Sequence, residues 1–124
     1  MVRTRSGAVA AGLLLWLVGC AGAPAPTPTV APVVTADGAQ RIEVTFAGGA
    51  VRGGIARFAV PRGADVQLVV FSDVADRVHV HGYDRLSYVT AGASTTVAFV
   101  ADLPGVVDVE LEQRGTLLAQ LQVG

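Results

Sequence analysis

From Arg41 onward, apolar and polar residues alternate in short runs, and this pattern constrains the fold of the chain more than any other feature. The alternation is clearest over residues 41–46 and 107–112. A period of two indicates β-strands that bury one face and expose the other. Turns containing glycine or proline separate the runs at intervals of about 8–12 residues, so about seven or eight strands are expected.

One run differs from the others because it is apolar on both faces. Residues 65–71 place Val66, Leu68 and Val70 on one face and Val69 and Phe71 on the other. A strand of this kind belongs in the interior of a sheet. No segment after residue 40 shows a convincing helical periodicity, so the expected fold is all-β, an antiparallel sandwich or barrel.

The beginning of the chain has the pattern of an export signal. Arg3 and Arg5 precede an apolar run over residues 8–18, which is short for a bilayer span but typical of a signal peptide. The run ends in Leu17-Val18-Gly19-Cys20, which resembles the bacterial lipobox. The resemblance implies a lipoprotein signal peptide over residues 1–19, cleavage after Gly19, and acyl chains on Cys20. The alternative is an ordinary secretory signal followed by an incidental cysteine.

Three parts are therefore expected: the signal peptide, a tether over residues 20–39, and a folded domain over residues 40–124. The tether is rich in proline and alanine, and proline favours extended polyproline II structure. Two or three acyl chains on Cys20 would anchor the chain firmly, since each buried CH₂ contributes about 0.8 kcal/mol. The expected location is the cell membrane, with the domain lipid-anchored and facing the periplasm or the cell exterior.

Composition excludes several classes of function. The chain has no lysine, and seven arginines and ten acidic residues follow Cys20. Because no basic stripe is present, nucleic acid is not expected as a partner. No glycine-rich loop joins a strand to a helix, so no nucleotide site is expected. Cys20 is the only cysteine, so the domain contains no disulfide and depends on its core and its sheet hydrogen bonds.

The order of the landmarks in residues 42–123 resembles a cupredoxin. A strand ending in a polar residue (69–73) leads to a histidine-bearing strand (78–81), and later Pro104-Gly105 opens a further strand (106–111). The resemblance is closest to the cupredoxin-like domains of bacterial exported proteins, many of which lack the copper centre. It implies a Greek-key antiparallel β-sandwich of seven to eight strands.

The resemblance also implies where copper ligands would stand. His79 falls at the first histidine ligand, and Leu111 falls where the family has its thiolate cysteine. The loop that would supply the remaining ligands has shrunk to residues 112–115, which contain neither histidine nor methionine. A type 1 copper centre needs two histidines and a cysteine, so blue copper electron transfer is not expected.

The remaining candidate for chemistry is the histidine pair itself. His79 and His81 are the only histidines, and side chains two apart on a strand point to the same side, about 6–7 Å apart. Such a pair can bind one metal ion, and Asp76, Asp84 or Tyr83 can supply oxygen ligands. This donor set suits Cu(II), and suits Zn(II) less well.

Two other interpretations of the pair stay open. The histidines are either solvated or hydrogen-bonded to neighbouring aspartates, or they form a pH-responsive contact surface. Arg77 lies on the same face, and its positive charge disfavours a metal ion. The acidic residues Asp108, Glu110 and Glu112 alternate along one strand, which is typical of a solvated strand face.

The sequence therefore supports two functional hypotheses. The first is a non-enzymatic, lipid-anchored binding module that contacts an envelope partner without a cofactor. The second is a copper- or zinc-handling lipoprotein that uses His79 and His81. An enzyme is not expected, because no nucleophile, base and orienting group can be assembled from these residues.

Overall fold

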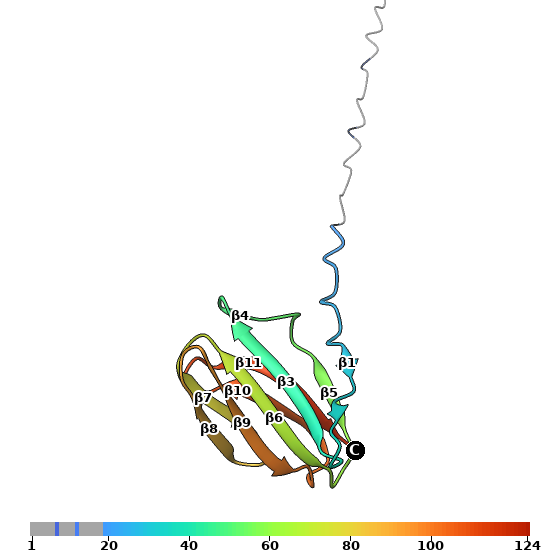
Figure 1. The fold of residues 1–124 in the computed structure, drawn as a ribbon. Helices are drawn as coiled ribbons and strands as arrows, with labels where there is room; N and C mark the ends of the chain where they lie inside the picture. The colour runs from blue at the N-terminus through green and yellow to red at the C-terminus, as the bar shows by residue number, and fades with distance from the viewer. Residues whose placement is uncertain (1–6, 8–11, 13–18) are drawn as a thin grey trace, which may run out of the picture.

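The structure is a computed structural model that describes Gly7, Gly12 and residues 19–124. Apart from Gly7, Gly12 and Gly19, the predicted signal peptide lies outside these described residues. Among the residues that are described, no helix is long and apolar enough to cross a membrane. All regular structure in this part of the chain is β-strand, arranged as two packed sheets (Figure 1).

The first sheet has six strands in the order β1-β5-β11-β10-β7-β8. Their bounds are β1 Thr29–Val30, β5 Arg57–Val60, β11 Thr116–Val123, β10 Gly105–Leu111, β7 Asp76–Val80 and β8 Arg85–Val89. The second sheet has five strands, in the order β2-β3-β6-β9, with β4 paired to β3. Their bounds are β2 Val33–Val34, β3 Gln40–Ala47, β6 Asp65–Ser72, β9 Ala93–Val100 and β4 Ala50–Val51.

The all-β prediction is confirmed, and the strand count agrees once length is considered. Eight strands of the described chain have four or more residues, while β1, β2 and β4 have two each. The expected antiparallel arrangement holds for six of the nine strand pairs. The other three are parallel: β3 with β6, and β5 with both β11 and β1. Alternation predicts which face of a strand is buried, but it does not encode the direction of the neighbouring strand.

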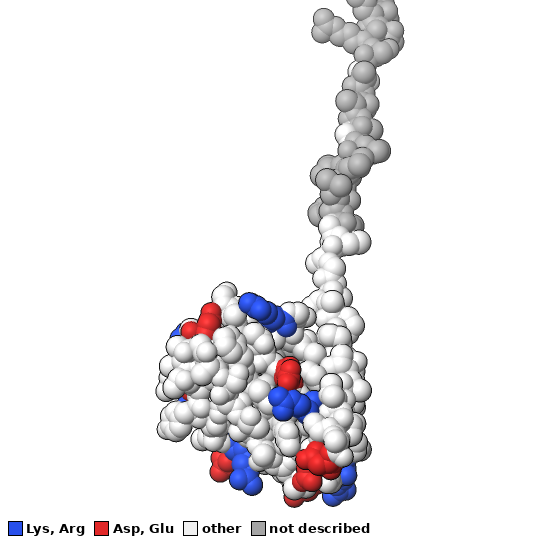
Figure 2. Space-filling view, viewed as in Figure 1, with Lys and Arg blue, Asp and Glu red and all other residues white. Residues whose placement is uncertain are grey.

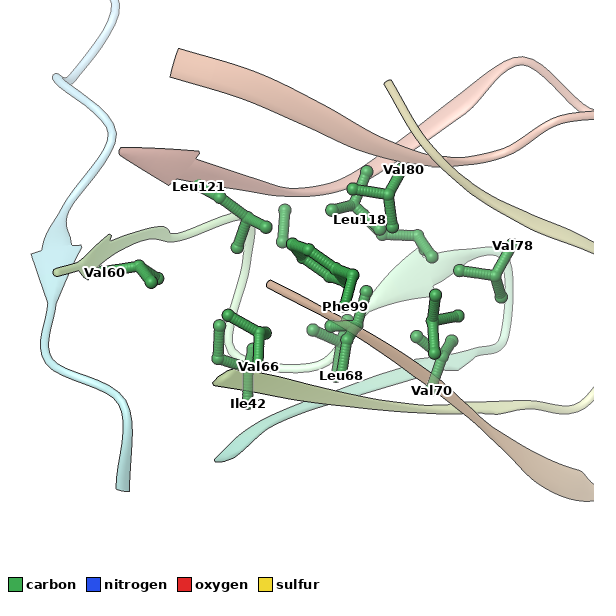
Figure 3. Close-up of a cluster of buried hydrophobic side chains, with 14 of the residues drawn as sticks. Ile42, Val60, Val66, Leu68, Val70, Val78, Val80, Phe99, Leu118 and Leu121 are labelled. Atoms are coloured by element: carbon green, nitrogen blue, oxygen red, sulfur yellow. The ribbon is translucent and has the colours of Figure 1, made fainter. Parts of the chain in front are cut away.

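The core lies between the two sheets and is built from the inward residues of each alternating strand (Figure 3). Leu68 and Val70 of β6 meet Val78 and Val80 of β7, and all four side chains are inaccessible to water. Strand β6 lies between β3 and β9, as its two apolar faces predict. Each fully buried side chain of this size contributes about 1.5–3 kcal/mol relative to its exposure.

The tether becomes part of the sandwich earlier than residue 40. Strand β1 adds to the edge of the six-stranded sheet, and the Arg57 N–H donates to the Pro28 carbonyl (2.8 Å). Strand β2 then adds to the edge of the other sheet. The Thr35 hydroxyl and the Ala39 N–H donate to the Asp37 carboxylate, and these bonds lower the pKa of that carboxyl. Residues 29–39 thus cover strand edges that would otherwise leave backbone groups unpaired.

Candidate metal site on the outer face of the six-stranded sheet

Strand β7 presents the two histidines to solvent because its alternate residues form the core. Val78 and Val80 are fully buried, so Arg77 and His79 point outward from the sandwich. His81 begins the turn after the strand, and its N–H donates to the carbonyl of Asp108 on β10 (3.0 Å). Gly82 follows with a φ of 80°, a conformation that favours glycine. The backbone therefore holds both imidazoles on one face.

Strand β10 supplies a third donor. It runs antiparallel to β7, and its register places Glu110 directly opposite His79. The Oε1 atom of Glu110 lies 2.7 Å from Nε2 of His81 and 3.9 Å from Nδ1 of His79. The centroids of the two imidazole rings are 4.3 Å apart, and the ring planes are inclined by 39°. One carboxylate oxygen thus approaches a nitrogen of each histidine.

These three side chains form a donor set that a divalent metal can bind. One ligand atom from each of His79, His81 and Glu110 lies within 4.8 Å of the others. Imidazole and carboxylate ligands bind Zn(II) and Cu(II) at about 2.0–2.1 Å, so closure requires only small side-chain rotations. The side chains of His79, Glu110 and His81 are 18%, 25% and 44% exposed, which leaves the group open to an ion from solvent.

The positive charge of Arg77 is compensated by Glu112, which lies on the same outer face of the sheet. Its Nη2 atom lies 3.0 Å from Oε2 of Glu112, and its guanidinium carbon lies 6.0 Å from the centroid of the Tyr88 ring. Opposite charges at facing positions of adjacent strands stabilise a sheet by about 0.2–1 kcal/mol per pair. Because Glu112 and Tyr88 contact this guanidinium, Glu110 is free to face the histidines.

A series of side-chain hydrogen bonds links Arg57, Gln120 and Asp108 on the neighbouring strands. Arg57 donates to Oε1 of Gln120 through Nε (3.2 Å) and Nη2 (2.9 Å). Gln120 in turn donates through Nε2 to Oδ1 of Asp108 (2.9 Å). The alternating acidic residues Asp108, Glu110 and Glu112 were expected to form a solvated strand face. In the structure each of them has a different partner: Gln120, the histidine pair and Arg77, respectively.

The two aspartates proposed from the sequence as oxygen ligands lie elsewhere. Asp76 is on the opposite side of β7 from His79, with its side chain fully buried. Its Oδ1 accepts the N–H groups of Arg77 (2.6 Å) and Gln113 (2.9 Å), and its Oδ2 lies 3.6 Å from Nε of Arg114. This carboxylate holds the β10–β11 turn and is not part of the histidine group.

Asp84 and Tyr83 also lie outside the group. Asp84 is exposed in the turn between β7 and β8 and has a φ of 50°. The Tyr83 hydroxyl donates to the Leu103 carbonyl (3.0 Å) and accepts the Leu103 N–H (3.2 Å). The Tyr83 ring packs against Phe99, with centroids 4.7 Å apart. Tyr83 therefore fastens the turn that follows the histidines to the opposite sheet.

Comparison with known proteins identifies the fold. No protein-family model and no curated protein sequence matches the chain. Among solved structures, the metal-binding domain of the Cu(I)-exporting P-type ATPase CopA of Streptococcus pneumoniae D39, solved with Cu(I), has a TM-score of 0.68 at 10% identity. That match covers 81% of this chain and 99% of that domain.

Two further structures show the same architecture. A copper-binding protein in its apo form has a TM-score of 0.57 at 12% identity, over 70% of this chain and 89% of that one. A multicopper oxidase from Campylobacter jejuni has a TM-score of 0.55 at 11% identity, over 79% of this chain and 30% of that one. The domain is therefore a cupredoxin-like β-sandwich whose structural neighbours are copper-binding domains.

The positions that the family resemblance assigns to type 1 copper ligands do not lie together in this structure. Leu111, the residue that the family resemblance places at the thiolate position, is fully buried in the core. His79 is on the other face of the same sheet, so the positions 79 and 111 do not converge on one ion. The single cysteine and the single methionine of the chain are Cys20 and Met1, so residues 29–124 contain neither.

Proposed function

We propose that this chain is a membrane-anchored, extracytoplasmic lipoprotein whose cupredoxin-like domain binds Cu(II) through His79, His81 and Glu110. The observation that carries the proposal is the convergence of the Glu110 carboxylate with both imidazoles on one sheet face. Nitrogen and oxygen donors favour Cu(II), and Zn(II) is the second choice for the same set. The role is metal binding and not catalysis or blue copper electron transfer.

The proposed anchor agrees with the position of the site. The tether enters the six-stranded sheet at β1, and β8 forms the opposite edge (Figure 1). At about 4.8 Å per strand, these edges are roughly 20–25 Å apart. A domain anchored through Cys20 would therefore carry its histidines on the strands far from the tether, where ions and envelope proteins have access.

A second candidate function is a protein-interaction domain that needs no metal. It is favoured by the exposed apolar residues of the edge strand β8, since Leu86 is 48% and Tyr88 is 75% exposed. Figure 2 shows that the face over β3, β6 and β9 carries few charges. An edge strand with exposed side chains can pair with an envelope protein.

Calorimetric titration of Cu(II) and then Zn(II) into the mature chain distinguishes the two candidates. The metal proposal expects micromolar or tighter Cu(II) binding at one site per chain and weaker Zn(II) binding. Binding of Cu(II) and binding of Zn(II) should both be lost in a His79→Ala/His81→Ala variant. Equal binding by the variant would contradict the proposed site, and no binding by either protein would leave the interaction domain as the function.

A further inference from the structure

The three protein donors leave the coordination of a bound metal incomplete. Zn(II) takes four ligands, and Cu(II) prefers a tetragonal set of nitrogen and oxygen donors. We propose that the metal bound by His79, His81 and Glu110 keeps an open position for an exogenous imidazole nitrogen. The incoming nitrogen would complete a ternary complex of protein, metal and imidazole. This inference rests on the proposed function of metal binding.

The strand beside His79 offers no fourth donor. On β8, the residue paired with His79 is Leu86, whose side chain contains only carbon and hydrogen. The next residue of β8 on that face is Tyr88, which pairs with Arg77 and lies against its guanidinium. On the β8 side of the histidines, the described structure therefore presents an apolar side chain where a ligand would otherwise stand.

The other outward carboxylate of β10 already has a hydrogen-bond partner. Asp108 lies next to Glu110 on the same face of β10, but its Oδ1 accepts from Gln120. Gln120 is fixed by two hydrogen bonds from Arg57 across β11 and β5. Asp108 is not among the side chains whose donor atoms lie within 4.8 Å of one another, so three protein donors converge and water is left as the fourth ligand in the resting site.

The open position is accessible from outside the molecule. The His81 side chain is 44% exposed, and Leu86 beside His79 is 48% exposed. An incoming imidazole would replace water: one metal–oxygen bond breaks, one metal–nitrogen bond forms, and the oxidation state of copper does not change. The nitrogen can come from a free imidazole compound or from a histidine of a protein, since both present the same donor.

Titration of the copper-loaded full mature chain in detergent micelles tests this inference. With one equivalent of Cu(II) bound, imidazole is added in one series, and a blocked Gly-His-Gly peptide in another. Electron paramagnetic resonance should show a change from two to three nitrogen donors, and gel filtration should show copper still migrating with the protein. A response to imidazole alone identifies a small-molecule source, and a response to the peptide identifies a protein histidine.

Variants at Leu86 provide the matched control. Leu86→His places an imidazole opposite His79 on the exposed edge strand, and should raise Cu(II) affinity at least tenfold while abolishing the response to added imidazole. Leu86→Ala should retain both the affinity and the response of the unmodified chain.

Two results would overturn the inference without affecting the proposed function. One is a copper-loaded chain whose spectrum does not change with imidazole or with the peptide. The other is loss of copper from the protein into solution as either compound is added, with no ternary complex at any concentration. Failure of the chain to bind Cu(II) at all would instead overturn the proposed function.

Discussion

At the scale of single residues, the character of the site depends on a carboxylate that approaches two imidazoles. Glu110 Oε1 lies 2.7 Å from His81 Nε2, so the carboxylate already contacts this imidazole in the metal-free chain. The same contact orients both side chains before any ion arrives. Orientation of this kind is what partners of metal-ligating histidines provide in known sites.

Replacing Glu110 by Gln tests its role as a ligand. The change keeps the size of the side chain but removes the negative charge, so Cu(II) affinity should fall by about 10–100-fold. Isothermal calorimetry measures the change. Glu112→Gln is the matched control, because Glu112 directly follows β10 and pairs with Arg77 and not with the histidines. Equal losses in the two variants would indicate a general charge effect and not coordination.

Asp76 allows the opposite test, of a carboxylate that stabilises the fold without binding metal. In Asp76→Ala the N–H of Gln113 loses its acceptor, and the free energy of unfolding should fall by about 1–3 kcal/mol. Asp76→Asn retains an acceptor oxygen and should lose less. Chemical denaturation measures both changes, and Cu(II) affinity of the folded variants should stay that of the unmodified chain. Weaker copper binding in Asp76→Asn would return Asp76 to the ligand set.

The sequence points to the two histidines but not to their carboxylate partner Glu110, because that partner depends on the pairing register of β7 and β10. Asp76 and Asp84 were proposed because they are close to the histidines in sequence, whereas Glu110 becomes a neighbour only when β10 pairs with β7. The sequence nevertheless contains a pattern that indicates this pairing. Arg77, His79 and His81 alternate along one strand, and Glu112, Glu110 and Asp108 alternate along another. Complementary rows of this kind favour antiparallel pairing of the two strands.

At the scale of strands, the alternation of apolar and polar residues predicts where the long strands lie. The long strands β3, β6 and β10 coincide with runs predicted from their apolar periodicity, because at least one face of each strand is buried. The parallel pairing of β3 with β6 was missed, since the direction of a neighbour depends on the path of the chain across the sandwich. Strands β1 and β2 were also missed, because two-residue strands in a proline-rich segment carry no periodicity.

Deleting six residues from the tether tests the structural role of β1 and β2. Removal of residues 29–34 should lower the free energy of unfolding by about 1–3 kcal/mol, because a few sheet hydrogen bonds are lost at about 0.5–1.5 kcal/mol each. The preceding residues cannot replace them fully, because Pro24, Pro26 and Pro28 have no N–H to donate.

Removal of residues 21–26 is the control of equal length. These residues belong to no strand, and their loss should change the free energy of unfolding by less than about 0.5 kcal/mol. Thermal and urea denaturation compare the two deletions. Equal stability of both variants would show that β1 and β2 contribute nothing to the sandwich.

At the scale of the whole molecule, the proposed metal site lies on strands far from the proposed lipid anchor, because β1 and β8 form opposite edges of the six-stranded sheet. The anchor is tested by replacing Cys20 with Ala in the full chain expressed in a bacterium. The unmodified chain should be recovered in the membrane fraction and should incorporate an alkyne-tagged palmitate. The variant should not incorporate the label, because its acyl acceptor is missing. Label on the variant would place the acyl group elsewhere.

The central claim, that two imidazoles and one carboxylate bind a single Cu(II) ion, is tested most directly by pulsed electron paramagnetic resonance. Spectra of the copper-loaded chain should show remote nitrogen couplings from two histidines, falling to one in His79→Ala and in His81→Ala, with no sulfur donor. Copper bound with no imidazole coupling, or with two couplings that persist in either single variant, would contradict the site described here.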